Sequence, residues 1–167
     1  MSAPNQTKVE LMAPLKNKQS LTAVLGHCDA VYFGIESLNM RMLSDNLKLA
    51  DLETVVSDCH DHDVRAYLAT NVILYDNEFE QLRRILERAS EAQIDAVIVH
   101  DLGVIELAKE LGLTFHISTQ ASISNLHAAR FYENLGAERL ILARELSLVQ
   151  IQEIKQKLSR AEIEVFI

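Results

Sequence analysis

The stretch TFHISTQ at residues 114–120, followed by AERLILAREL at residues 137–146, decides the fold expected of this chain. Each half is a short apolar run of strand type that ends abruptly in polar residues and leads into an amphipathic helix. In sheets of parallel strands that alternate with helices, chemistry is found just beyond the carboxyl ends of the strands. The polar residues in that position are Ser118, Thr119, Gln120, Arg144 and Glu145.

The same pattern recurs along the whole chain. Strand-like runs are found at residues 9–12, 30–33, 65–69, 96–99, 114–118, 139–142 and 164–167, and helical spacing is clear at 51–60, 78–90 and 122–135. Asn77 with Glu80, and Ser147 with Gln150, resemble capping boxes, and the glycines at 26, 112 and 136 follow leucine where helices should end. This alternation predicts parallel strands joined by right-handed crossovers.

Two architectures fit such an alternation, an open doubly wound sheet and an eight-stranded barrel. The open sheet usually carries a glycine-rich loop after its first strand, and residues 13–17 (APLKN) do not form one. A complete barrel needs about 200–250 residues. We therefore expect residues 1–167 to form a single, truncated TIM-type (β/α) barrel domain with about seven parallel strands and six helices. The strand pattern is interrupted at Ile167, which suggests a chain boundary or a missing tail.

Composition narrows the function classes. The formal net charge of −8 argues against a general nucleic-acid binder, which would show a basic face. There is no apolar run of about 18 residues to span a membrane, and residues 1–8 lack the apolar core of a signal peptide. A cytoplasmic protein is expected. Cys28 and Cys59 are far apart in sequence, and we expect free thiols rather than a disulfide or metal ligands.

Residues 58–63 (DCHDHD) resemble a metal site, but they follow a predicted helix at the bottom of the barrel. His60 and His62 are two positions apart, so on a helix they would point about 200° away from each other. We interpret the cluster as a solvated helix terminus, and no metal site is predicted.

The strand ends provide the candidate site. Side chains alternate along a strand, so His116, Ser118 and Gln120 should share one face; if Phe115 and Ile117 pack on helices, this polar set faces the barrel mouth. An imidazole, a hydroxyl and an amide are suited to orienting a polar substrate and moving a proton. The candidates for catalysis are His116, Ser118, Gln120 and Glu145, and those for ligand binding are Arg41, Asn71, Thr119 and Arg144.

Each of these residues also has a structural interpretation. Asp101, also at a strand end, could cap the following helix. Arg144 and Glu145 could form surface ion pairs of little value, and His116 could be a satisfied core histidine. Motifs of higher specificity, such as Gly-x-Ser-x-Gly, His-Glu-x-x-His or a phosphate-binding loop, do not occur.

Several blocks of the sequence resemble the collagenase-like peptidase family of unassigned catalytic type. They are residues 9–14 (VELMAP), 29–34 (DAVYFG), 101–103 (DLG), 118–120 (STQ) with Asn125, and 143–146 (AREL), and residues 163–167 resemble the strand before a His-Gly-Ala-x-Cys segment in that family. The chain departs from the family at Leu15-Lys16, where Ala-Gly is usual, and at His27-Cys28. By position, seven candidates match family-typical residues: Arg41, Asn71, His116, Ser118, Gln120, Arg144 and Glu145.

This resemblance implies the amino-terminal barrel portion of a peptidase, not active as this fragment alone and ending before the family's cysteine-containing segment. Family members are usually named as proteases. Several relatives instead support hydroxylation of RNA or of a ubiquinone precursor, with cysteine-bound iron–sulfur clusters and, in the RNA branch, prephenate. No cofactor is expected in this fragment, since Cys28 and Cys59 do not match the cluster cysteines.

Two functional hypotheses therefore stay open. The first is a peptidase that acts on peptides and needs the carboxyl-terminal part. The second is a scaffold for iron–sulfur-dependent hydroxylation that holds a small carboxylate through Arg41 or Arg144. Because an incomplete barrel leaves strand edges unpaired, we also expect self-association.

Overall fold

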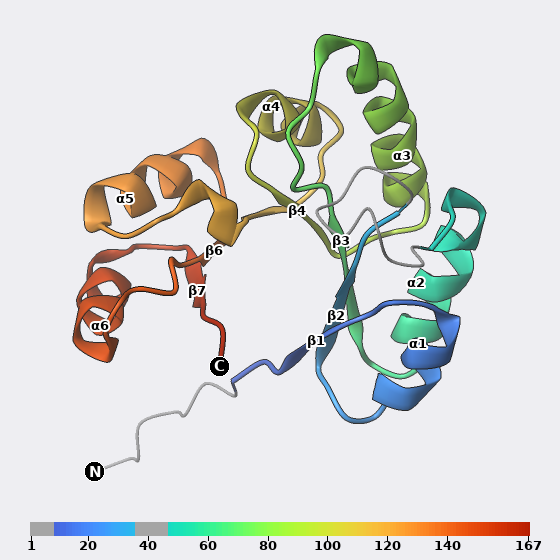
Figure 1. The fold of residues 1–167 in the computed structure, drawn as a ribbon, viewed down its shortest axis with the longest axis horizontal. Helices are drawn as coiled ribbons and strands as arrows, with labels where there is room; N and C mark the ends of the chain where they lie inside the picture. Colours follow the sequence, from blue (N-terminus) through green and yellow to red (C-terminus); the bar gives the residue numbers. More distant parts are fainter. Residues whose placement is uncertain (1–8, 36–46) are drawn as a thin grey trace.

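Seven parallel strands form one curled sheet in the computed structural model, which describes residues 9–35 and 47–167. Their spatial order equals their order in sequence, and every neighbouring pair is parallel. The strands are β1 (Met12–Pro14), β2 (Ala30–Phe33), β3 (Arg65–Ala69), β4 (Ala96–Val99), β5 (Phe115–Ile117), β6 (Arg139–Ile141) and β7 (Glu162–Glu164). Figure 1 shows this succession as an incomplete TIM-type barrel, as predicted.

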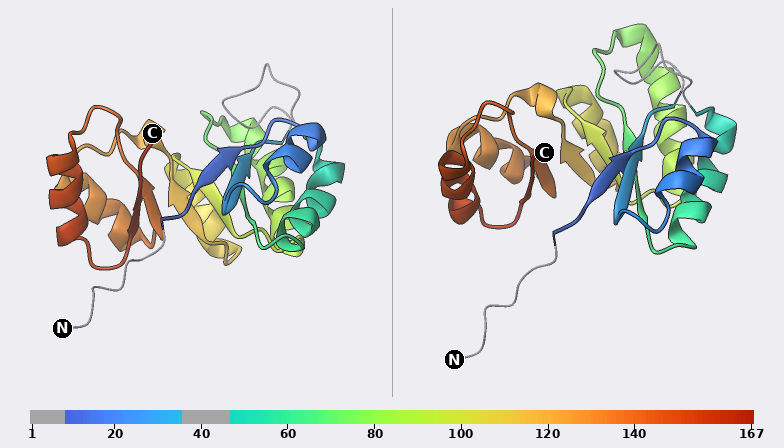
Figure 2. Two further views of the ribbon diagram at one scale, coloured as in Figure 1. Left: turned by 90° about the horizontal axis from the view of Figure 1, so that it is seen from below. Right: turned by 60° about the horizontal axis from the view of Figure 1, so that its bottom comes forward.

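Six α-helices in the described ranges cover the outer, convex face of the curled sheet (Figures 1 and 2). They are α1 (Lys18–Val24), α2 (Leu52–His60), α3 (Phe79–Glu91), α4 (Leu102–Glu110), α5 (Leu126–Leu135) and α6 (Leu148–Lys157). The capping box predicted at Ser147 and Gln150 begins α6, and Gly136 ends α5 with a positive φ of 105°. None of the helices described is long and apolar enough to cross a bilayer.

The two faces of the sheet differ in composition. The outward-pointing residues, such as Leu68, Val97 and Ile117, join the helices in the main apolar core. The inward-pointing residues form a much smaller apolar cluster of Ala30, Tyr67, Ala96, Ile98 and Ile141. Because the inner face holds few apolar side chains, it has room for polar and charged ones.

Three elements differ from the sequence-based expectation by more than one residue at an end. β1 is Met12–Pro14 rather than 9–12, and Leu11 is instead held by a hydrogen bond from its backbone N–H to the Asp29 carboxylate at 2.9 Å. β7 is Glu162–Glu164 rather than 164–167, because β6 ends at Ile141 and the chain then turns away. α5 begins only at Leu126, since Ser122 adopts a left-handed φ of 49° and Asn125 caps the helix.

The capping box expected at Asn77 and Glu80 lies two residues earlier. There the backbone N–H of Tyr75 donates to the Glu78 carboxylate at 2.8 Å, within a short 3-10 turn at Asp76–Glu78 that precedes α3. Periodicity alone does not distinguish such a turn from the first turn of the helix, which explains the shift.

The turn before β7 is held by a buried carboxylate from α5. Glu133 Oε1 accepts backbone hydrogen bonds from Ser159, Arg160 and Ala161 at 2.9, 2.7 and 2.9 Å. These three N–H groups would otherwise be unpaired as the chain leaves α6. Glu133 thereby fixes where β7 starts relative to β6.

Candidate functional site

The two segments that decide the fold lie side by side at the carboxyl ends of β5 and β6. β5 and β6 pair in parallel, with His116 opposite Arg139 and Ile117 opposite Leu140. Just above this pairing, the Thr119 hydroxyl donates to the Leu142 carbonyl at 3.3 Å. The Ser-Thr-Gln and Arg-Glu segments therefore share one end of the sheet.

Asn71 and Ser118 join two non-adjacent strand ends. The Asn71 side chain follows β3, and its Nδ2 donates to Ser118 Oγ, beyond β5, at 3.1 Å. This bond passes over the end of β4, which lies between the two strands. Ser118 is buried, and its Oγ also accepts from the backbone N–H of Gln120 at 3.4 Å, so a short 3-10 turn starts here. Since Ser118 Oγ accepts both contacts, its own hydrogen is available to donate.

His116 lies deeper, on the inner wall of the curled sheet. Phe115 and Ile117 pack in the helix-covered core, which turns His116 inward as alternation requires. Its ring contacts Tyr67 edge-on, with centroids 4.8 Å apart. Burial, with the nearby Arg139 and Arg65 charges, lowers the pKa of His116 to about 3, so its ring is neutral at neutral pH.

His116 is buried, as its interpretation as a core histidine requires, but its ring nitrogens are not satisfied. The residue is 1% exposed, but neither ring nitrogen has a hydrogen-bond partner among the described residues. The Glu138 carboxylate lies 3.8 Å from Nε2, beyond hydrogen-bond distance. His116 and Ser118 also share no hydrogen bond, so the described part of the chain does not assemble them into a nucleophile–base pair.

Arg144 and Glu145 are both exposed beyond β6. The Arg144 guanidinium lies over the Phe166 ring at 4.4 Å, a cation–π contact that orients the side chain. The surface ion pairs considered for these two residues do not form with any residue that the structure describes. Gln120 is half-buried in the turn after β5. Arg41 lies outside the described residues.

Two other polar groups have structural roles. The Asp101 carboxylate accepts from the backbone N–H groups of Gly103 and Val104 at 2.8 and 3.3 Å and caps α4. In the 58–63 segment, His60 Nε2 contacts the Asp95 carboxylate at 2.9 Å, and His62 Nδ1 lies 2.8 Å from the Asp58 carbonyl. Within residues 9–35 and 47–167, no group of three or more His, Cys, Asp or Glu could hold a metal ion.

The structure reveals an inner charge cluster that the sequence-based analysis missed. The Glu10 carboxylate accepts from Arg139 at 2.6 Å and from the Tyr67 hydroxyl at 3.1 Å, and it forms an ion pair with Arg65. Arg139 also donates to Glu162 at 2.8 Å and lies 3.5 Å from Glu164.

Burial raises the pKa of Glu164 to about 7, although Arg139 acts in the opposite direction. Arg139 compensates Glu164 poorly because its guanidinium already binds two other carboxylates. One signal in the sequence could have indicated part of this cluster. Side chains alternate along a strand, so Glu162 and Glu164 share one face of β7, and Arg139 starts the neighbouring strand β6. Placing them inside the sheet requires knowing that the sheet curls.

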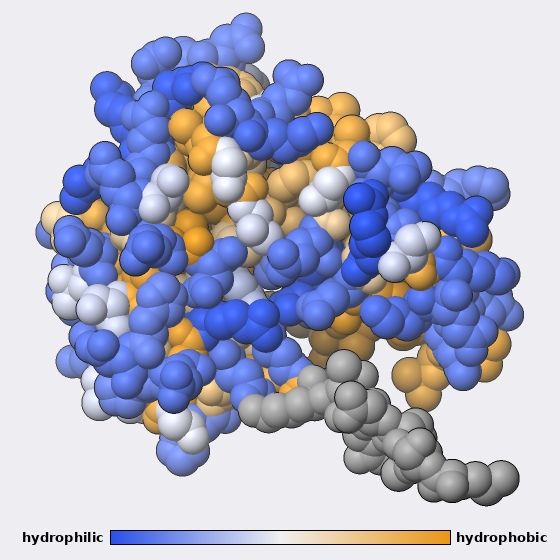
Figure 3. All heavy atoms as spheres, turned by 180° about the vertical axis from the view of Figure 1, so that it is seen from behind, coloured by the Kyte–Doolittle hydropathy of each residue, from blue (hydrophilic) through white to orange (hydrophobic). Residues whose placement is uncertain are grey.

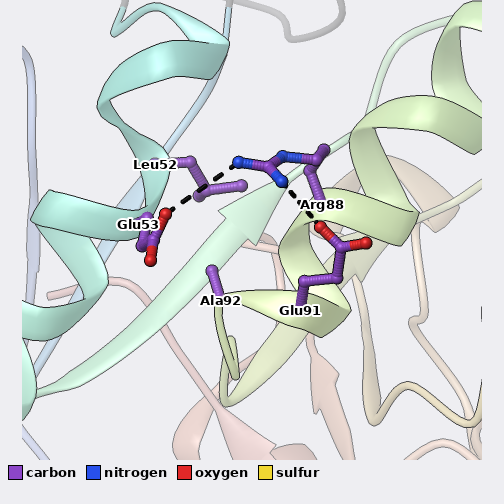
Figure 4. A pocket seen from close by; sticks show the side chains of 5 residues that line it. All are labelled: Leu52, Glu53, Arg88, Glu91 and Ala92. Carbon is purple, nitrogen blue, oxygen red and sulfur yellow. Dashed lines mark hydrogen bonds and ion pairs between the residues drawn. The ribbon is translucent and has the colours of Figure 1, made fainter.

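A hollow of about 150 Å³ lies outside the barrel, between α2 and α3 (Figure 4). Its lining residues are Leu52, Glu53, Arg88, Glu91 and Ala92, none of which is a candidate from the sequence. Arg88 bridges it, 2.7 Å from Glu91 and 3.9 Å from Glu53. Its only cation is already neutralised, so it lacks the features of a polar ligand site.

Comparison with known proteins agrees with this geometry. The chain is 40% identical to an uncharacterized protease of Methanocaldococcus jannaschii over 94% of its length, and 39% identical to a collagenase of Porphyromonas gingivalis over 95%. It is also 31% identical, over 96% of its length, to the tRNA hydroxylation protein P1 of Bacillus subtilis. It spans only 39%, 39% and 38% of these three relatives, respectively.

A solved structure shares the fold. The structure of a U32 peptidase superposes with a TM-score of 0.76 over 98% of this chain and 72% of that one, at 20% identity. Residues 16–167 match peptidase family U32. This match agrees with the strand-end geometry and with the relatives at 30–40% identity. The chain therefore belongs to peptidase family U32.

Proposed function

We propose that this chain is the ligand-binding barrel portion of a U32 protein and that a protein as long as its relatives supports hydroxylation of RNA. One observation supports this over hydrolysis. Ser118, the hydroxyl at the strand ends, receives its hydrogen bond from the Asn71 amide, which cannot take a proton from it. The arrangement is suited to holding a polar ligand rather than attacking a peptide bond.

The ligand we propose is a small carboxylic acid bound near Arg144. A guanidinium binds a carboxylate with two parallel hydrogen bonds, and the contact with Phe166 restricts where that guanidinium can point. No described carboxylate competes for it. Arg41 is the second arginine expected from the sequence. Prephenate, which the family resemblance suggests, is the first acid to test.

An iron–sulfur cluster does not fit the described residues. The chain has two cysteines, Cys28 and Cys59, whereas these clusters take four cysteine thiolates as ligands, and the described residues contain no group of three or more His, Cys, Asp or Glu that could hold a metal ion. A cluster in the proposed protein would therefore need cysteines outside this chain. In the proposal, this chain binds and orients the acid.

The test is genetic and chemical. The full-length gene is deleted, and hydroxylated nucleosides in transfer and ribosomal RNA are measured by mass spectrometry. We expect loss of a hydroxylated nucleoside, restored by the wild-type gene and by Arg84→Ala on the exposed face of α3, but not by Arg144→Ala. Unchanged RNA after deletion would overturn the proposal.

Peptide hydrolysis is the second candidate, favoured by the identities of 40% and 39% to relatives named protease and collagenase. It is tested by incubating the full-length protein with a broad peptide library and with collagen. Cleavage that Ser118→Ala abolishes would replace the first proposal with this one. Absence of cleavage together with a change in RNA would remove it.

A further inference from the structure

The two ring nitrogens of His116 are the main unsatisfied polar atoms of the inner wall. The ring is 1% exposed, and both nitrogens lack hydrogen-bond partners in the described part of the chain. An unpaired buried polar group costs about 1–3 kcal/mol. An inner wall that only had to pack could avoid this cost with an apolar residue, as Ile98 and Ile141 do on the same face.

His100 repeats this feature one strand away. β4 and β5 pair with Val99 opposite Ile117, so His100 and Ser118 follow at the next position, on the inner side of the sheet. The Nδ1 atom of His100 is also buried without a partner among the described residues. Asn71 reaches over the same place to bond Ser118 at 3.1 Å. Side chains from the ends of β3, β4 and β5 thus converge above His116.

The surrounding charges decide what this wall can accept. Arg139 and Arg65 disfavour a positive charge at His116. The described residues contain no group of three or more His, Cys, Asp or Glu that could hold a metal cation. The wall offers the Ser118 hydroxyl hydrogen and imidazole N–H groups as donors, and these match oxygen acceptors.

We infer that Asn71, His100, His116 and Ser118 form an inner subsite for the oxygen atoms of a small acid, namely its hydroxyl, keto or carboxylate groups. The subsite lies below the strand ends, and it rests on the proposed function because it would hold the part of the acid that extends inward from Arg144. His116 would then be a binding residue rather than a catalytic one.

The experiment uses the purified chain with 15N-labelled histidine and prephenate as the probe. On titration at pH 7.5, the ring 15N signals of His116 and His100 should move, while those of the exposed His127 should not. Calorimetry should show at least tenfold weaker binding for His116→Phe and for His100→Ala, and unchanged binding for His127→Ala. Circular dichroism establishes that each variant is folded. If a variant does not fold, the movement of the His116 and His100 ring 15N signals in the wild type decides whether the subsite binds prephenate.

The outcomes separate the two claims. If prephenate binds but the His116 and His100 signals stay fixed and both variants bind as the wild type does, the subsite is wrong and the proposed function stands. If prephenate does not bind the wild type, the subsite is wrong, and the RNA measurement after gene deletion decides the proposed function separately.

Discussion

Glu10 and Arg139 are 129 positions apart in sequence, yet their side chains meet at 2.6 Å inside the curled sheet. Glu10 precedes the first strand and Arg139 starts the sixth, so this ion pair crosses the interior between the two arms of the open barrel. Both side chains are largely buried, with 13% and 5% exposed. Figure 2 shows how far the sheet must curl for such a contact to form.

Arg139→Met should destabilise the fold strongly. Removing one partner of a buried ion pair leaves uncompensated carboxylates, at a cost of about 3–5 kcal/mol. The measure is the free energy of unfolding in urea. Arg83→Met is the matched control, because Arg83 pairs with Glu110 at 3.0 Å on the exposed surface, where an ion pair stabilises the fold only slightly. Equal losses of unfolding free energy in the two variants would show that the buried Glu10–Arg139 pair stabilises the fold no more than the surface pair does.

His116 should make the fold sensitive to acid. The pKa of His116 lies near 3 in the folded chain against 6.5 in the unfolded one. Its contribution to the free energy of unfolding is therefore fully present above pH 6.5 and is lost as the pH falls toward 3. The groups facing it are Arg139, Arg65, Tyr67 and Glu138. The loss is on the order of 5 kcal/mol. In urea unfolding at pH 7 and pH 4.5, His116→Phe should lose less stability than the wild type; identical profiles would contradict this.

Glu164 should act in the opposite direction. The pKa of Glu164 is raised from 4.5 to about 7. Its contribution to the free energy of unfolding is therefore fully present below pH 4.5 and is lost as the pH rises through 7. The stability at stake is on the order of 3 kcal/mol. Glu164→Gln keeps the shape without the charge and should be more stable than the wild type at pH 8, with a smaller difference at pH 5. If Glu164→Gln and the wild type were equally stable at both pH 8 and pH 5, the raised pKa of Glu164 would be refuted.

The two free edges of the sheet should lead to self-association. In the described sheet β1 and β7 each pair on one side only, and exposed apolar residues lie next to them: Val9, Leu11, Val165, Phe166 and Ile167. Figure 3 shows apolar patches among the hydrophilic surface. Light scattering should give a mass that rises with concentration, and Val165→Lys with Ile167→Lys should reduce it. A stable monomer at high concentration would contradict this.

The parallel order of the strands could be predicted from the sequence because local signals are strong there. The β4 run AVIV is buried on both faces, and Gly112 and Gly136 adopt the positive φ expected after a helix. The inner wall could not be predicted, because it depends on contacts between distant segments. Nothing near Glu10 in sequence indicates Arg139, and nothing near Asn71 indicates Ser118.

The candidate site shows the same division. Alternation correctly turned His116 inward, since that property belongs to one strand. Whether its nitrogens have partners depends on side chains from neighbouring strands, and the position of Asn71 depends on its bond to Ser118, beyond β5. The ion pairs considered for Arg144 gave way to Phe166, a partner from the next strand segment that sequence spacing does not reveal.

The most direct test of the account is the affinity of the purified chain for prephenate, measured by calorimetry for the wild type, Arg144→Ala and the exposed control Arg84→Ala. Loss of a charge-assisted bidentate contact should weaken binding about tenfold or more, whereas the control should bind like the wild type. Equal affinity of all three proteins would contradict the claim that the ends of β5 and β6 hold a small carboxylic acid.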